Sequence, residues 1–155
     1  MAAGEDACVQ QMALNNKMRS CLPGDDRQVY PVLKQLTSKS PIITQIDGLF
    51  LPAECDYLVQ KARDAGFEAS ETRGRHGKGE VSALRTSRTS VLPEEDAVVA
   101  CVRRRLATVA GMPPDSLEPL QATSYTHGQQ YKGHHDDDEA AGSRGRKRRL
   151  RTIFG

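Results

Sequence analysis

The chain has 155 residues, enough for one domain with a single core and extensions at its ends. No run of about 18 apolar residues occurs, so the sequence predicts no membrane-spanning segment. Residues 1–13 carry Glu5 and Asp6 where a signal peptide would be basic, and by default we expect a cytoplasmic protein. Lys and Arg total 22 against 20 Asp and Glu, a balance that argues against a dedicated nucleic-acid-binding protein.

The four cysteines show no spacing typical of a zinc site or a redox motif. We expect buried or incidental thiols in a reducing compartment, although an even number of cysteines leaves disulfides open. The four are Cys8, Cys21, Cys55 and Cys101.

The first quarter of the chain differs from the rest in polarity and in periodicity. Residues 1–40 are polar and irregular, and we interpret them as a loosely held N-terminal extension. Beyond them Ile42, Thr44 and Ile46 occupy alternate positions, which is the period of a short strand. We therefore place the folded domain at residues 41–155.

Two helices are predicted. The first begins at Pro52, has apolar residues at helical spacing and ends at Gly66, where a left-handed cap fits. The second begins at Pro93, with acidic residues 94–96 at the positive end of its dipole. Residues 103–105 are three arginines late in this helix. Because consecutive residues point around a helix, we interpret them as a solvated helix end and not as a phosphate-binding patch.

The remaining segments indicate loops and strands. Residues 70–80 contain three glycines and predict a mobile loop, and Arg-Thr-Ser at residues 85–87 stands where a strand should begin. Strands are expected over residues 120–125 and 131–136, with a tight connection at residues 126–128. Helices followed by strands indicate an α+β fold.

The candidate chemistry lies in the last of these strands. His134 and Asp136 are two positions apart, so in a strand both side chains leave the same face with their Cα atoms about 6.6 Å apart. An imidazole and a carboxylate are two of the three ligands in the facial triad that binds non-haem Fe(II). An H-x-D tripeptide alone is weak evidence, because it arises often by chance.

The surrounding residues make the pattern more specific. Residues 120–136, LQATSYTHGQQYKGHHD, closely resemble the signature of prolyl 4-hydroxylase-like, 2-oxoglutarate- and Fe(II)-dependent dioxygenases: L-Q, Tyr, G-Q, Tyr, then H-x-D. Residues 42–62 resemble the opening strand and helix of the family. Residues 85–87 match its Arg-Thr-Ser, and residues 149–152 resemble its R-x-x-T. The resemblance spans about residues 41–155 in the family's order.

This resemblance implies a fold, an activity and a set of cofactors. The fold would be a double-stranded β-helix, a jelly-roll-like barrel with the N-terminal helices flanking it. The activity would be hydroxylation of proline, or of another residue, in a peptide or protein, with Fe(II), 2-oxoglutarate, O2 and L-ascorbate. Family members often enter the secretory pathway, so the endoplasmic reticulum is a second possible location.

The resemblance also implies residue roles. By position, His134 and Asp136 would be the catalytic iron ligands, and Tyr125 would contact 2-oxoglutarate. A phenol suits that role, since it can donate a hydrogen bond to a carboxylate. Arg85, Ser87 and Arg149 would lie near the peptide substrate.

One part of the family pattern is missing. The family has a second histidine well downstream and a lysine about ten residues after it. The 19 residues that follow Asp136 contain no histidine. His76, His127 and His135 are each poor substitutes. We therefore expect a fragment whose barrel is incomplete at the C-terminus.

Two alternatives to an active enzyme stay open. The chain is a non-catalytic remnant that binds a peptide or a partner protein, or its basic residues 144–151 bind nucleic acid and the H-x-D is incidental. We interpret the acidic and basic run over residues 136–151 as a solvated loop between two strands.

Overall fold

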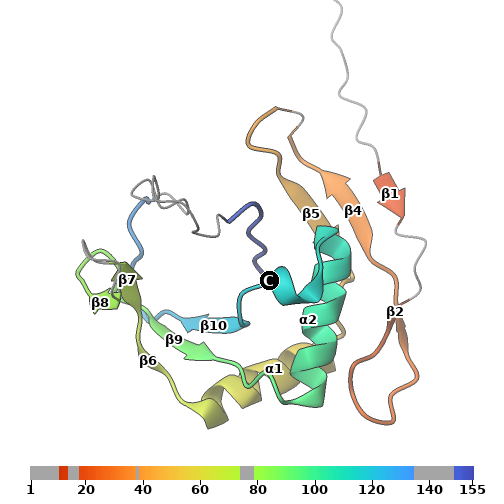
Figure 1. Cartoon of the computed structure of the whole chain (residues 1–155), viewed down its shortest axis with the longest axis horizontal. Coiled ribbons are helices and arrows are strands. Elements are labelled where there is room, and N and C mark those ends of the chain that lie inside the picture. The colour runs from red at the N-terminus through yellow and green to blue at the C-terminus, as the bar shows by residue number, and fades with distance from the viewer. Residues whose placement is uncertain (1–10, 14–17, 38, 74–78, 135–148) are drawn as a thin grey trace, which may run out of the picture.

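The computed structural model describes residues 11–13, 18–37, 39–73, 79–134 and 149–155. Within these ranges the chain forms helices and small antiparallel sheets, as the predicted α+β class requires (Figure 1). Two three-stranded sheets have the orders β1-β4-β5 and β10-β9-β6, and two further strand pairs are β2-β3 and β7-β8. The elements are β1 (Gln11–Ala13), β2 (Met18–Arg19), β3 (Gln28–Val29), β4 (Val32–Gln35), β5 (Thr44–Asp47), α1 (Pro52–Ala65), β6 (Glu68–Ala69), β7 (Glu71–Arg73), β8 (Gly79–Val81), β9 (Arg88–Val91), α2 (Ala97–Ala110), the 3-10 helix η1 (Pro114–Ser116) and β10 (Gln121–Ser124).

Helix α1 covers the β10-β9-β6 sheet (Figure 1). It begins at Pro52 as predicted, because the fixed φ of proline suits the first helical position. Ala62 is buried with Leu92 and Val99, and its carbonyl oxygen accepts a hydrogen bond of 2.9 Å from Ser90 Oγ on β9. Gly66 ends the helix with φ 86° and ψ 152°, so the glycine is used but the predicted left-handed cap is not formed.

Helix α2 begins at Ala97, four residues after the predicted start, because Asp96 caps it. The Asp96 carboxylate accepts hydrogen bonds from the backbone N–H groups of Val98 and Val99. The same carboxylate accepts from Tyr57 Oη at 2.8 Å and pairs with Lys61 Nζ at 2.9 Å, so one cap joins α1 to α2. At the other end the helix stops at Gly111 in the left-handed conformation.

Residues 18–37 belong to the packed structure. Strand β4 pairs with β5 over its whole length, from Val32 opposite Asp47 to Gln35 opposite Thr44. Val29 is 3% exposed. The interpretation of residues 1–40 as a loosely held extension is therefore wrong for this stretch, since a short polar segment is ordered here by pairing with a strand of the folded part.

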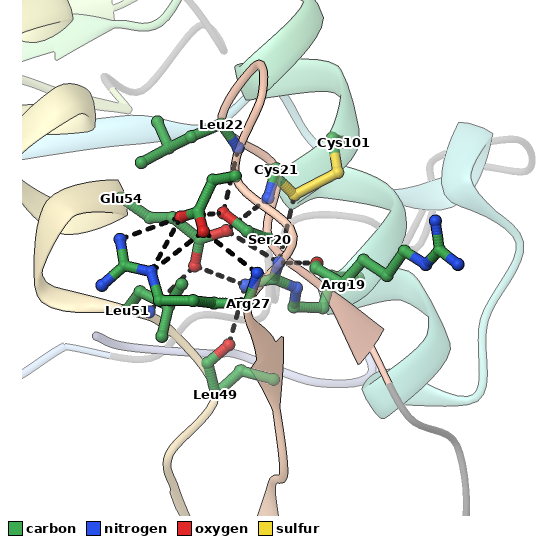
Figure 2. A network of polar contacts seen from close by, with 11 residues as sticks. Arg19, Ser20, Cys21, Leu22, Arg27, Leu49, Leu51, Glu54 and Cys101 are labelled. Carbon is green, nitrogen blue, oxygen red and sulfur yellow. Dashed lines mark hydrogen bonds and ion pairs between the residues drawn. A yellow bond between two sulfur atoms is a disulfide. The ribbon is translucent and has the colours of Figure 1, made fainter.

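A buried ion pair connects this N-terminal segment to both helices (Figure 2). Glu54 is the third residue of α1, and its carboxylate is fully buried. It pairs with both terminal nitrogens of Arg105 at 2.8 Å and accepts from the backbone N–H groups of Cys21 and Leu51. Arg105 also donates to the carbonyl oxygen atoms of Leu49 and Arg19.

The arginine run of α2 therefore does not form a solvated helix end. Arg105 is 5% exposed and carries the buried charge, whereas Arg104 is exposed. Arg103 is partly buried and donates to the carbonyl oxygen of Leu117 at 2.6 Å. Consecutive residues do point around the helix, as the sequence predicts, but one of the three directions leads into the core.

A disulfide lies next to this ion pair. Cys21 is bonded to Cys101 of α2 across 80 positions of sequence (Figure 2). Arg105 Nη2 lies 3.2 Å from Cys21 Sγ. Cys55 is an exposed thiol, and Cys8 lies outside the described residues. The expectation of incidental thiols is thus wrong for Cys21 and Cys101, because the fold brings together two cysteines that no local motif connects.

The two ends of the predicted loop over residues 70–80 are strands that pair with each other. Strands β7 and β8 pair from Glu71 opposite Val81 to Arg73 opposite Gly79. Residues 74–78, at the centre of the predicted loop, lie outside the described residues. Among the residues that are described, no helix combines the length and the apolar character that crossing a bilayer needs.

We predict that Arg105→Met destabilises the protein by about 3–5 kcal/mol, because it leaves the Glu54 carboxylate buried without its cation. Burial opposes ionisation of Glu54, but the hydrogen bonds from Arg105, Cys21 and Leu51 outweigh it and lower the pKa of this carboxyl below its usual 4.5. A lowered pKa adds stability that is complete above about pH 4.5 and is lost as the pH falls through the folded-state value.

Urea unfolding between pH 3 and 7 measures both effects. The matched control is Arg104→Met, which changes an exposed arginine one position away and should alter stability by about 0.5 kcal/mol or less. Equal losses in the two variants would contradict a structural role for the buried pair.

We predict that reduction of the disulfide, or Cys101→Ser, lowers the free energy of unfolding by about 2–5 kcal/mol, since the bond closes a long loop of the unfolded chain. Cys55→Ser is the control, because this thiol is exposed and unbonded. Thermal unfolding with and without a phosphine reductant, with thiol counting by mass spectrometry, tests the prediction. A midpoint unchanged by full reduction would refute it.

Candidate active site

The site is built along one strand and its N-terminal extension. Strand β9 pairs with β10 from Val91 opposite Gln121 to Arg88 opposite Ser124. The preceding residues 84–86 pair instead with residues 130–132, through a bridge between Arg85 and Tyr131 and backbone hydrogen bonds of 2.9 Å on either side. Residues 84–91 thus pair with two successive segments of chain: residues 84–86 with residues 130–132, and β9 with β10.

A turn separates these two segments. The Gln129 N–H donates to the carbonyl oxygen of Thr126 at 3.0 Å, and Gly128 adopts φ 82°, a value that glycine reaches without strain. The tight connection at residues 126–128 is therefore confirmed. The strand predicted over residues 131–136 is wrong for residues 131–134, which form no ladder beyond the single bridge, because this segment follows β9's extension and not β10.

Arg85 lies at the centre of the site and is fixed by three acceptors. Its Nε donates to Ser87 Oγ at 3.4 Å, Nη1 donates to the carbonyl oxygen of Glu71 at 3.3 Å, and Nη2 donates to Thr89 Oγ1 at 3.2 Å. The buried hydroxyl of Ser70 in turn contacts those of Ser87 and Thr89 at 2.9 and 2.6 Å. Ser70 thus supports the two hydroxyl groups that accept hydrogen bonds from the guanidinium.

Two polar groups, a guanidinium and an imidazole, contact the phenol ring of Tyr131. The Arg85 Cζ atom lies 4.8 Å from its centroid, a cation–π distance. The His134 ring stacks on it with centroids 3.7 Å apart and an interplanar angle of 16°. Tyr131 thus connects Arg85 to His134.

A backbone contact selects the tautomer of His134. Its Nδ1 lies 2.9 Å from the carbonyl oxygen of Lys132, and because a carbonyl only accepts, Nδ1 carries the proton. The lone pair then resides on Nε2, the form in which histidine commonly binds metal ions. The imidazole is exposed to solvent.

The structure brings together some of the predicted site residues and separates others. Arg85, Ser87 and His134 belong to one set of contacts. Tyr125 is half-exposed and comes one residue after β10, at the end of the sheet where Ser87 lies. Arg149 lies elsewhere, in a two-point ion pair with Glu118 at 2.7 and 2.8 Å.

Only some of the residues predicted to take part in metal binding are among the described residues. Asp136 and His135 lie outside them, as do His76 and the basic residues 144–148. In the part of the chain that the structure describes, no three His, Cys, Asp or Glu side chains are placed to hold a metal ion. His134 fits such a role by its tautomer and exposure. Residues 149–155, which include the R-x-x-T motif, have no regular secondary structure.

Sequence reasoning gave no role to Tyr131, which contacts both Arg85 and His134, although the residue stands in the signature three positions before His134. It also missed Glu118, the partner of Arg149. The spacing of Tyr131 from His134 was the available signal for the first, whereas nothing local indicates the second.

Comparison with known proteins finds similarity to prolyl 4-hydroxylases of a plant. The chain is 31% identical over 105 residues to prolyl 4-hydroxylase 2 of Arabidopsis thaliana, a match that covers 67% of this chain and 35% of the relative. It is 30% identical over 108 residues to prolyl 4-hydroxylase 1 of the same plant, covering 68% and 38%. A probable prolyl 4-hydroxylase 4 is 29% identical over 105 residues, covering 67% and 35%. The chain therefore spans about a third of the length of these relatives, and no family model matches it.

We predict that Ser70→Ala and Ser87→Ala each lower the free energy of unfolding by about 1–3 kcal/mol, since each leaves a buried hydroxyl without one partner. The double variant should cost less than the sum, because the two hydroxyls share a hydrogen bond. Ser124→Ala on the exposed face of β10 is the control. Strict additivity in chemical denaturation would show that the two hydroxyls are not coupled.

Proposed function

We propose that the chain is part of a prolyl 4-hydroxylase-type, 2-oxoglutarate- and Fe(II)-dependent dioxygenase, which hydroxylates proline or another residue in a peptide or protein. The observation that carries the proposal is that two motifs 49 positions apart in sequence, Arg85-Thr86-Ser87 and the H-x-D at His134, meet through Tyr131. Similarity of about two thirds of the chain to prolyl 4-hydroxylases supports it. The proposed fold is a double-stranded β-helix, of which the small antiparallel sheets would form a part.

The residues of this chain have distinct roles in the proposal. His134, through Nε2, and Asp136 would hold Fe(II), which with 2-oxoglutarate and O2 supplies the oxidising chemistry, while L-ascorbate keeps the iron reduced. The Tyr125 hydroxyl would donate to a carboxylate of 2-oxoglutarate. Arg85 would contact the peptide, with the buried Ser87 hydroxyl holding its guanidinium. Arg149 is assigned to the peptide only by its place in the R-x-x-T motif, since it pairs with Glu118 away from Arg85. His134 is exposed to solvent, as a metal-binding imidazole requires.

Metal binding by the 155-residue chain should be weak. A facial triad has three protein ligands, and His134 with Asp136 supplies two. We therefore expect little coupled turnover of 2-oxoglutarate by this chain alone, with the residual metal affinity depending on His134.

The test is Co(II) binding measured by calorimetry, with Co(II) as an air-stable substitute for Fe(II). His134→Ala should weaken binding at least about tenfold, whereas His127→Ala, which removes an exposed histidine in the nearby turn, should have no effect. Equal Co(II) affinity in the wild type and His134→Ala would overturn the role of His134.

Turnover and peptide binding are measured on the same proteins. Robust Fe(II)-dependent succinate formation that disappears in His134→Ala would refute the expected low turnover and strengthen the enzyme assignment. Binding of a proline-rich peptide, without any dependence of Co(II) affinity on His134, would favour a non-catalytic peptide-binding module instead.

A further inference from the structure

The charge of Arg85 is directed at Tyr131. Among the described residues, the atoms that accept hydrogen bonds from its guanidinium are two hydroxyl oxygens and one carbonyl oxygen, all uncharged. They fix the plane of the guanidinium but do not neutralise it. The positive charge therefore attracts the electron-rich face of the Tyr131 ring, whose centroid lies 4.8 Å from Cζ.

The position of the Tyr131 ring depends on Arg85 in two ways. The backbones of the two residues form an antiparallel bridge, flanked by the hydrogen bonds Thr86 N–H to Gln130 and Lys132 N–H to Leu84. The side chains then meet through the cation–π contact. Backbone and side chain together place the phenol ring beside the segment 84–86.

Two contacts of the His134 imidazole within the described part of the chain lead back to this same segment. Its ring stacks on Tyr131, which Arg85 holds. Its Nδ1–H donates to the carbonyl oxygen of Lys132, whose own N–H donates to Leu84. Because residues 131–134 form no strand ladder of their own, these contacts take the place of sheet pairing in directing the imidazole.

We propose that Arg85 is a positioning residue for His134, which it orients through the Tyr131 ring, in addition to any contact with a peptide. The effect of this orientation on metal binding rests on the proposed function, whereas the orientation itself does not. A peptide-binding arginine would alter peptide affinity only. A positioning arginine also alters His134 in the chain without metal and without peptide.

The test is the NMR signal of the His134 ring in the full chain, without metal or peptide. A ring stacked at 3.7 Å on a phenol has its proton resonances displaced by the ring current, so Hδ2 and Hε1 of His134 should lie upfield of the other histidines. Arg85→Ala should move them toward the values of an unstacked histidine. Arg88→Ala, three residues away at an exposed position of β9, is the matched control and should leave them in place.

Tyrosine variants keep the test valid if Arg85→Ala fails to fold. Tyr131→Phe preserves the ring and should retain the displaced signals, whereas Tyr131→Leu should abolish them. Arg85→Lys keeps a charge but loses the planar guanidinium. Its His134 signals should therefore lie between those of the wild type and those of an unstacked histidine. Unchanged His134 signals in Arg85→Ala, or in Arg85→Lys if the alanine variant does not fold, would overturn the proposal.

A second measurement separates this proposal from the proposed function. Co(II) affinity should fall about three- to tenfold in Arg85→Ala and in Tyr131→Leu, with no further loss in the double variant, because both act on the same imidazole. If Arg85→Ala moves the His134 signals while His134→Ala leaves Co(II) affinity unchanged, the positioning role stands and the metal-binding function fails. If the signals do not move, the positioning role fails whatever the metal affinity.

Discussion

The buried ion pair between Glu54 and Arg105 joins three parts of the chain that are far apart in sequence: α1, α2 and the segment that contains Cys21. Burying two charges is costly unless their hydrogen-bonding groups are satisfied, and here the backbone supplies the additional partners. The pair therefore requires all three parts to be in place at once. The Cys21–Cys101 bond holds the same junction covalently.

The helices fixed in this way support the sheet on which the site lies. Helix α1 packs on β9, and β9 continues backwards into the segment that carries Arg85 and Ser87. Tyr131 and His134 reach this segment only because a four-residue turn redirects the chain after β10. The proposed chemistry thus depends on a short, irregular stretch that is oriented by side-chain stacking, an arrangement more sensitive to single substitutions than a paired strand.

The errors of sequence reasoning share a physical cause. Hydrophobic periodicity and turn residues report on local structure, and they located both helices and the turn at residues 126–128. They could not indicate that Arg105 meets a carboxylate 51 positions away, or that Cys21 bonds with a residue 80 positions away. Polar composition suggested a loose segment before residue 41, whereas residues 32–35 are ordered by pairing with the next strand, β5, whose existence composition alone does not reveal.

The sequence by itself determined the α+β class, the start of α1, the presence of a second helix and the motif residues Arg85, Ser87 and His134, because each depends on residue type and short-range spacing. Only the tertiary structure decided that Tyr131 lies between Arg85 and His134 and which nitrogen of His134 carries the proton. Those features depend on how segments far apart in the chain pack together, and no local propensity encodes that packing.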